Sequence, residues 1–179
     1  MSIPTPALDA LRGTLPDDLK DIRLNLGAVL TGENLASQQA LGVALAAARF
    51  VRAGGLAAAM EADLRAGLGD AAAPVISDAV AAAGLMAMNT VYYRFRHMLG
   101  KESYEARSPR LRMSRMAQPA TSKLDFELMS LACAALAGCE LCIKNHEASL
   151  LHLGAGEEAC HDAVRIAAVV NAAACGLEA

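Results

Sequence analysis

Apolar residues recur at intervals of three and four through most of the chain, which is the spacing of one face of an α-helix. No segment combines strict apolar alternation with the β-branched residues that strands favour. The pattern therefore predicts an all-α protein. Glycines, prolines and clusters of charge divide it into expected helices at about residues 17–31, 35–52, 56–68, 72–98, 122–138, 139–154 and 156–177.

A few local signals mark the helix boundaries. Residues 31–34 read TGEN and resemble a capping box, while residues 53–55 read AGG and interrupt the apolar pattern. Ser122 or Thr121 can cap the helix that follows, with Asp125 in its first turn. We therefore expect a helix to begin or end at each of these positions.

One segment differs in composition from the rest of the chain. Residues 100–121 carry two prolines, many charges and weak periodicity, which is typical of a linker. We expect a single domain, 1–179, made of two halves at about 1–99 and 122–179 that this linker joins.

The two halves share a weak internal similarity. A shift of 49 positions lays Glu127 on Asp78 and His146 on His97, within apolar helical pairs. The match indicates a helical bundle with an internal duplication of a helical unit. Chance matching in an alanine-rich helical sequence is the alternative.

Composition narrows the class of protein. The chain is 55% apolar but only 3% aromatic, and it has no Trp, so its apolar content is mostly small and aliphatic. Such residues favour closely packed helices and leave apolar surface for an oligomer. The longest apolar runs fall short of the roughly 18 residues of a membrane span. We expect a soluble protein with no membrane partner.

Charge and the first residues bear on partners and location. A net charge of −3 argues against a nucleic-acid binder, which needs excess positive charge along the phosphate backbone. The first residues lack the basic start and apolar stretch of a secretory signal, so we expect the cytoplasm. An odd number of cysteines suits that reducing compartment better than a disulfide framework. The five are Cys133, Cys139, Cys142, Cys160 and Cys175.

Several residue sets receive structural interpretations. Cys133, Cys160 and Cys175 lie at expected helix-core positions and are assigned no role. Six methionines are expected to fill the core: Met60, Met86, Met88, Met113, Met116 and Met129. Four arginines are expected in a solvated segment, with an anionic partner as the alternative: Arg107, Arg110, Arg112 and Arg115.

The strongest chemical signal is the segment from Gly138 to His146. Gly138 ends one expected helix, so Cys139 should lie at the start of the next, where the helix dipole and free N–H groups lower a thiol pKa. Cys142, three residues on, is within disulfide reach of Cys139. His146 follows one turn later and can reach back toward the Cys142 sulfur, as in an activated nucleophile.

Glu127 is a candidate partner for this group. It stands 12 residues before Cys139, on or beside the buried face of the preceding helix. A tight turn at Gly138 brings an antiparallel helix back to about that level, where the carboxylate can orient His146 or take its proton. A carboxylate that deep usually has a partner.

Two structural interpretations of the cysteine pair stay open. The pair can be half of a zinc site, completed by Cys160, His161 or His152, although the usual second knuckle is missing. It can also be two small residues that only pack. His97, His152 and His161 are expected as packing or surface groups.

The segment FELMSLACAALAGCELCIKNHE resembles the active-site segment of the AhpD alkylhydroperoxidases, which belong with the carboxymuconolactone decarboxylase-like proteins. Those proteins carry a Glu, then CxxC, then a His four residues on. Stretches reading LPDDLKDIRLNLGAVL, MAMNTVYYRF and LRMSRMAQP are similar to the same family in the same order, so the resemblance covers nearly the whole chain.

The resemblance implies an AhpD-like helical bundle, assembled as a homotrimer. It implies a thiol peroxidase that uses no tightly bound cofactor and no metal. Its cysteine pair is oxidised by an alkyl hydroperoxide or by an AhpC-type peroxiredoxin, and is reduced by dihydrolipoamide on a lipoyl-bearing acyltransferase. In that comparison Cys142 attacks the peroxide, Cys139 resolves the sulfenic acid, and Glu127 with His146 relays protons.

One position departs from the family pattern. Some members carry a second His directly before the second cysteine, where this chain has Leu141, so that role is not carried over. Two rival functions remain: a decarboxylase-type enzyme using His and Glu as acid and base without the thiols, and a zinc-stabilised helical protein.

Overall fold

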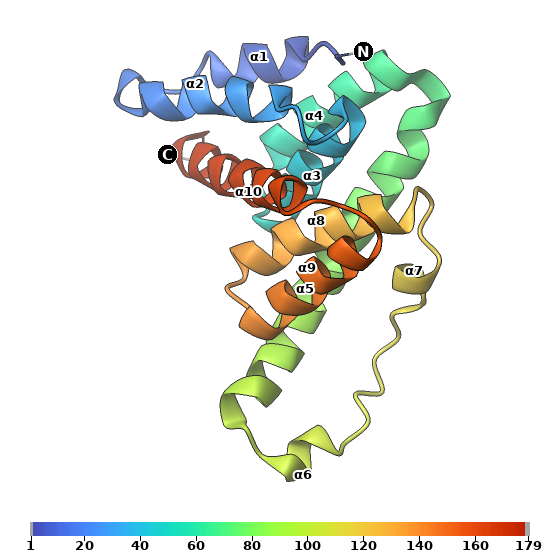
Figure 1. Ribbon diagram of the computed structural model, residues 1–179. Coiled ribbons are helices and arrows are strands. Elements are labelled where there is room, and N and C mark those ends of the chain that lie inside the picture. The colour runs from blue at the N-terminus through green and yellow to red at the C-terminus, as the bar shows by residue number, and fades with distance from the viewer. Residues whose placement is uncertain (1, 178–179) are drawn as a thin grey trace.

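A computed structural model describes residues 2–177, and this part of the chain contains helices and no strand, as the apolar pattern predicts (Figure 1). Short 3-10 turns stand at Asp17–Leu19, Val29–Thr31 and Gly69–Ala71. The α-helices are α1 (Pro6–Arg12), α2 (Lys20–Ala28), α3 (Ser37–Phe50), α4 (Gly54–Leu68), α5 (Ala72–Leu99), α6 (Glu102–Glu105), α7 (Ser114–Ala117), α8 (Lys123–Leu136), α9 (Glu140–His152) and α10 (Glu157–Leu177).

The predicted helices are confirmed to within a few residues, with two differences at the N-terminal side. The first helix, α1, was not predicted, because seven residues are too few to carry a periodic pattern. The capping-box prediction at 31–34 was wrong: α3 begins later, and the backbone N–H of Ala36 donates to the Gln39 side chain at 2.9 Å. Ser122 caps α8 by accepting the N–H of Asp125 at 3.0 Å.

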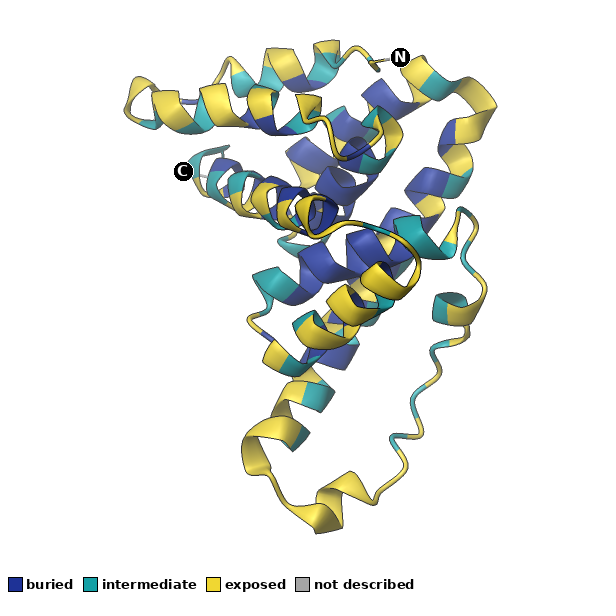
Figure 2. Cartoon of the chain, in the orientation of Figure 1, coloured by how far each residue is buried: buried dark blue, intermediate teal, exposed yellow. Residues whose placement is uncertain are grey.

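Two central helices form the middle of the core. Residues 40–48 of α3 and residues 126–134 of α8 are buried without interruption, as expected for helices surrounded by other helices (Figure 2). Gly42 allows α3 to come close to its neighbours, since a Cβ there would stand 2.6 Å from Cε of Met129 and 3.1 Å from Cγ1 of Val75. Small residues thus set the close packing of this core.

The other helices surround this pair. The first part of α5 packs against α3 and α8, α9 packs against α8 and α5, and α10 lies across α3 and α8. Helices α1 and α2 cover α4 and α10 at one end of the molecule (Figure 1). The last part of α5 extends beyond the core, and its apolar side chains Val91, Phe95 and Met98 are exposed.

The segment 100–121 runs back along the outside of the bundle from the end of α5 to the start of α8 (Figure 1). Most of its residues are exposed or half-buried (Figure 2). Its last residues are held by Asp78 on α5, whose carboxylate accepts the backbone N–H groups of Ala120 at 3.0 Å and Thr121 at 2.7 Å. Arg115 also pairs with Asp78, so this arginine is not a freely solvated side chain, contrary to expectation.

Length and apolar composition alone would allow two stretches, Gly54–Leu99 and Glu157–Leu177, to cross a membrane. This is weak evidence, because core helices of soluble proteins pass the same test. Both stretches pack against the central helices, and both bury charged side chains, among them Asp78 and Asp162.

Candidate active site

The turn between α8 and α9 positions the first cysteine. Gly138 has a φ of 63°, in the left-handed region that side-chain-bearing residues avoid, and it reverses the chain. Cys139 follows as the N-cap of α9, and its carbonyl oxygen accepts the N–H of Ile143 at 2.9 Å. The expected position of Cys139 at a helix start is therefore confirmed.

The two cysteines of the motif form a disulfide, with their Cα atoms 5.3 Å apart. Their surroundings differ. Cys139 is fully buried, whereas Cys142 is 6% exposed and lies on the wall of a pocket. Of the two cysteines, only Cys142 therefore borders a space that an incoming molecule can enter.

His146 and Glu127 meet inside the protein, as the antiparallel turn predicts. The Nδ1 atom of His146 lies 2.5 Å from Oε2 of Glu127, and both side chains are buried. The other carboxylate oxygen of Glu127 lies 2.7 Å from Nζ of Lys123, one turn earlier on α8. The carboxylate thus has a partner on each oxygen.

These partners determine the charge of Glu127. Burial on its own would raise the pKa of this carboxyl, but hydrogen bonds from His146 and Lys123 outweigh burial and hold the pKa below its usual value. Glu127 is therefore ionised at neutral pH, and the imidazole edge that faces it carries the proton on Nδ1.

The other imidazole nitrogen faces sulfur. The Nε2 atom of His146 lies 3.2 Å from Sδ of Met86, on α5. Within residues 2–177, no hydrogen bond joins His146 to Cys142, whose sulfur is engaged in the disulfide. Cys142 and His146 do line the same pocket. The two side chains are therefore neighbours, as predicted, but they are not in direct hydrogen-bond contact.

That pocket has a volume of about 310 Å³ and lies between α5, α9 and the segment around α7. Its walls are mostly apolar, and Leu141 contributes to them at the position where some family members have a His. Three of the methionines that were expected to fill the core contribute to this lining: Met86 is buried in the core as expected, whereas Met113 and Met116 are half-buried. The lining residues are Met86, Asn89, Tyr93, Met113, Met116, Leu141, Cys142, Asn145 and His146.

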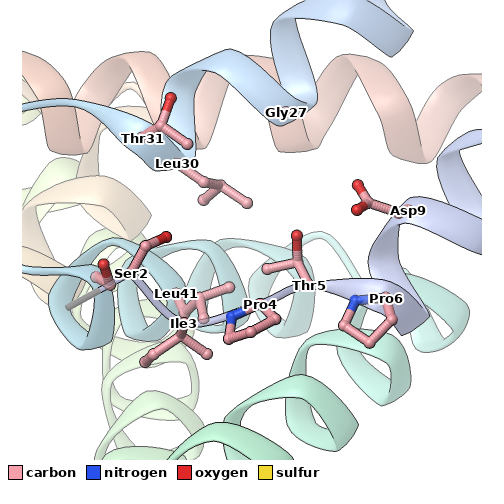
Figure 3. A pocket seen from close by; sticks show the side chains of 11 residues that line it. Ser2, Ile3, Pro4, Thr5, Pro6, Asp9, Gly27, Leu30, Thr31 and Leu41 are labelled. Carbon is pink, nitrogen blue, oxygen red and sulfur yellow. The ribbon is translucent and has the colours of Figure 1, made fainter.

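A larger pocket, about 370 Å³, lies at the other end of the fold, between residues 2–6, α2 and the start of α3. Figure 3 shows the side chains of Thr5, Asp9 and Leu30 around it. No cysteine or histidine lines it, so size alone does not indicate the site of chemistry.

The acid and histidine of the first half are not brought together. Asp78 anchors the segment before α8, with its pKa lowered because hydrogen bonds from Ala120, Thr121 and Arg115 outweigh the effect of burial. His97 is exposed, and its ring lies 3.8 Å from Glu140. The first half thus lacks the histidine–carboxylate pair that the second half has.

The remaining cysteines lie outside the pocket. Cys133 and Cys160 are buried, and burial raises the pKa of both thiols. Cys175 is exposed, so its prediction as a core residue was wrong. Among residues 2–177, no three His, Cys, Asp or Glu side chains gather as a metal site would require; His152, His161 and Cys160 do not complete a ligand set around the cysteine pair.

Sequence reasoning missed three residues at this site. Lys123 could have been noticed from its i, i+4 spacing to Glu127. Met86 and Asn89 come from α5, at least 53 residues before Cys142, and no local pattern connects them to the motif.

Comparison with known proteins identifies similar chains along nearly the full length. A sequence model of the carboxymuconolactone decarboxylase family matches residues 104–175. The chain is 55% identical over 172 residues to alkyl hydroperoxide reductase AhpD of Anaeromyxobacter sp. (strain Fw109-5), covering 96% of this chain and 91% of that protein. Proteins of the same name from Rhodopseudomonas palustris (strain BisB18) and Methylobacterium sp. (strain 4-46) are 44% and 45% identical, covering 97% and 96% of this chain and 94% and 96% of their own.

Proposed function

Because this chain belongs to the AhpD family of alkyl hydroperoxide reductases, we propose that it reduces alkyl hydroperoxides with the thiols of Cys139 and Cys142. The observation that carries the proposal is the contrast between the two sulfurs. Cys142 opens onto an apolar pocket that His146 also lines, while Cys139 is buried behind it. An organic peroxide fits such a pocket better than a highly hydrated molecule does.

The reaction begins with the reduced pair. The Cys142 thiolate attacks the terminal oxygen of the hydroperoxide, an S–O bond forms, and the O–O bond breaks. The alkoxide that leaves takes a proton and becomes an alcohol. The Cys139 thiol then attacks the sulfenic acid of Cys142, which forms the disulfide and releases water.

His146 and Glu127 handle the protons in this scheme. The imidazole receives the Cys142 thiol proton and returns it to the alkoxide, while the Glu127 carboxylate holds the ring in one orientation and stabilises its charged form. The 2.5 Å contact between Nδ1 and Oε2 supports this assignment. Lys123 supports it further, because its charge helps to keep Glu127 ionised.

Reduction of the disulfide requires an external dithiol, for which we propose dihydrolipoamide on a lipoyl-bearing acyltransferase. Its two thiols are oxidised to lipoamide as Cys139 and Cys142 regain their protons. We further propose that the protein reduces an AhpC-type peroxiredoxin by the same exchange. The reaction needs no tightly bound cofactor, and the cytoplasm would maintain the reduced state.

We also propose a homotrimer. The exposed apolar residues on the last part of α5, Val91, Phe95 and Met98, supply surface that an assembly could bury. Sedimentation of the purified protein tests this assignment independently of its activity.

The decisive experiment is peptide mapping by mass spectrometry after one equivalent of cumene hydroperoxide and again after dihydrolipoamide. We expect a Cys139–Cys142 disulfide that forms and is then rapidly reversed. Cys142→Ser should abolish peroxide consumption, whereas Cys175→Ser should leave it unchanged, because Cys175 is an exposed thiol outside the pocket. Retained thiols after peroxide treatment would favour the acid–base alternative of the decarboxylases.

A further inference from the structure

Two buried side-chain atoms in the described part of the chain have no hydrogen-bond partner, Oδ1 of Asn89 and Oγ of Ser130. Buried polar groups are nearly always paired, so each exception calls for an explanation. Ser130 lies in the middle of the buried run of α8 and does not line the pocket of Cys142. Asn89 does line it, on the same face of α5 as Met86, one turn away.

The contacts of Asn89 leave its amide free for a ligand. The side chain is buried, with only 4% of its surface exposed. Its Nδ2 group faces Sδ of Met116 at 3.6 Å, and a thioether is a weak acceptor. The amide thus lacks a strong partner on either side, and rotation about its broad χ2 torsion can turn both groups toward the pocket.

We propose that Asn89 binds the O–O–H group of the hydroperoxide, an inference that rests on the function proposed above. The amide oxygen accepts the hydrogen of the terminal O–H, and the amide N–H donates to the inner oxygen, which bears the alkyl group. A primary amide presents its acceptor and donor side by side, as this pair of contacts requires. The hydroperoxide O–H thus supplies the donor that Oδ1 of Asn89 does not find within the described part of the protein.

Asn89 acts on the step in which charge develops. As the Cys142 sulfur bonds to the terminal oxygen and the O–O bond breaks, negative charge moves to the inner oxygen, which leaves as the alkoxide. An N–H donor at that oxygen stabilises the transition state more than the ground state. The proton that completes the alcohol comes from His146.

This arrangement also distinguishes between oxidants. A disulfide has no O–H to donate and no leaving oxygen, so Asn89 has nothing to recognise in it. The amide should therefore accelerate oxidation of the cysteine pair by hydroperoxides and leave oxidation by small disulfides unaffected.

The test compares the wild type with Asn89→Leu, which is similar in shape, and with the smaller Asn89→Ala in case leucine does not fit. The fully reduced proteins are mixed with cumene hydroperoxide or with dimethyl disulfide, which has no hydroxyl group, and loss of thiols is followed by rapid quenching and alkylation. We expect roughly 10- to 100-fold slower oxidation by the hydroperoxide, the usual effect of removing a hydrogen bond to a charged group. Oxidation by the disulfide should change less than about two-fold by the same argument.

Stability and a matched control complete the experiment. Asn89→Leu removes an unpaired buried polar group, so its resistance to urea should equal or exceed that of the wild type. Ser130→Ala removes the other unpaired atom and should leave both oxidation rates unchanged. A large loss of stability in both Asn89 variants would assign a structural role to the residue and overturn the proposal.

The kinetic outcomes distinguish a failure of the Asn89 proposal from a failure of the proposed hydroperoxide reductase function. Equal slowing with both oxidants, or an unchanged hydroperoxide rate in a reactive protein, would overturn the role of Asn89 alone. A wild type that reacts with cumene hydroperoxide no faster than free cysteine would overturn the proposed function and the role of Asn89 together.

Discussion

The Nδ1 atom of His146 and the Oε2 atom of Glu127 lie 2.5 Å apart, although 19 residues separate the two along the chain. The contact joins α9 to α8 across the turn at Gly138, in a region where both side chains are buried. A buried carboxylate needs further hydrogen bonds to be stable, and Lys123 provides one to the second carboxylate oxygen.

Glu127→Gln should slow oxidation of the cysteine pair by a hydroperoxide without unfolding the protein. Glutamine keeps the shape of the side chain but loses the negative charge that stabilises the imidazole as it takes the Cys142 proton, so formation of the thiolate slows. The deficit should shrink as pH rises and the thiol ionises unaided. A stopped-flow series from pH 6 to pH 10 measures this, and a deficit that does not depend on pH would argue against proton transfer in this pair.

His146→Gln should reduce the same rate by about 100-fold or more, the usual effect of removing a positioned acid–base group. His152→Gln is the matched control, since it removes an exposed imidazole from the last turn of the same helix. We expect the control to react at the wild-type rate. Similar rates in both variants would exclude His146 from the mechanism.

Asp78→Asn should destabilise the fold at pH 7 by about 2 to 3 kcal/mol, because hydrogen bonds to an ionised group are replaced by weaker ones. Asp78 accepts from Arg115, Ala120 and Thr121, which attach the end of the linker to α5. Urea unfolding followed by circular dichroism measures the difference. A change below about 0.5 kcal/mol, typical of a surface site, would contradict this anchoring role.

The stability difference between the wild type and Asp78→Asn should depend on pH in one direction. The folded-state pKa of Asp78 is below its usual value of 3.8, so the carboxylate stabilises the fold above about pH 3.8 and loses this effect as pH falls further. The difference in free energy of unfolding between the wild type and Asp78→Asn should therefore decrease below pH 3.8 and stay constant above about pH 5.

Two glycine substitutions should change the stability of the fold in opposite directions. Gly138→Ala forces a side chain into a left-handed backbone and should cost about 1 kcal/mol, although no atom blocks the added Cβ. Gly84→Ala, inside α5 and also facing open space, should instead stabilise the protein by up to about 1 kcal/mol. Thermal unfolding of both variants measures these changes. If both substitutions raised the unfolding temperature, or both lowered it, the argument from backbone conformation would be contradicted.

The sequence predicts most of this fold because its apolar pattern is strongly helical. Residues 40–48 and 126–134 lie in the two helices whose apolar runs are easiest to recognise, and helical spacing alone places Cys139, Cys142 and His146. Glu127 requires only one further assumption, a tight turn at Gly138. Local rules suffice where the contacts are local.

The features that the sequence did not predict depend mostly on contacts between distant segments of the chain. Arg115 meets Asp78 from 37 positions away, and Met86 meets His146 from 60 positions away. The pocket that contains Asn89 exists only because α5, α9 and the segment around α7 converge. Cys175 resembles a core residue by its neighbours, but it lies on the outer side of α10. The division of the chain into halves 1–99 and 122–179 stays a prediction.

The unequal burial of the two sulfurs has a consequence for enzyme kinetics. Because Cys139 is enclosed and Cys142 alone opens onto the pocket, a reducing thiol must enter by the route that the peroxide uses. We therefore expect the two substrates to take turns, with parallel lines in double-reciprocal plots and inhibition by either one in excess. The mixed disulfide formed during turnover should involve Cys142, with Cys139 as the sulfur released.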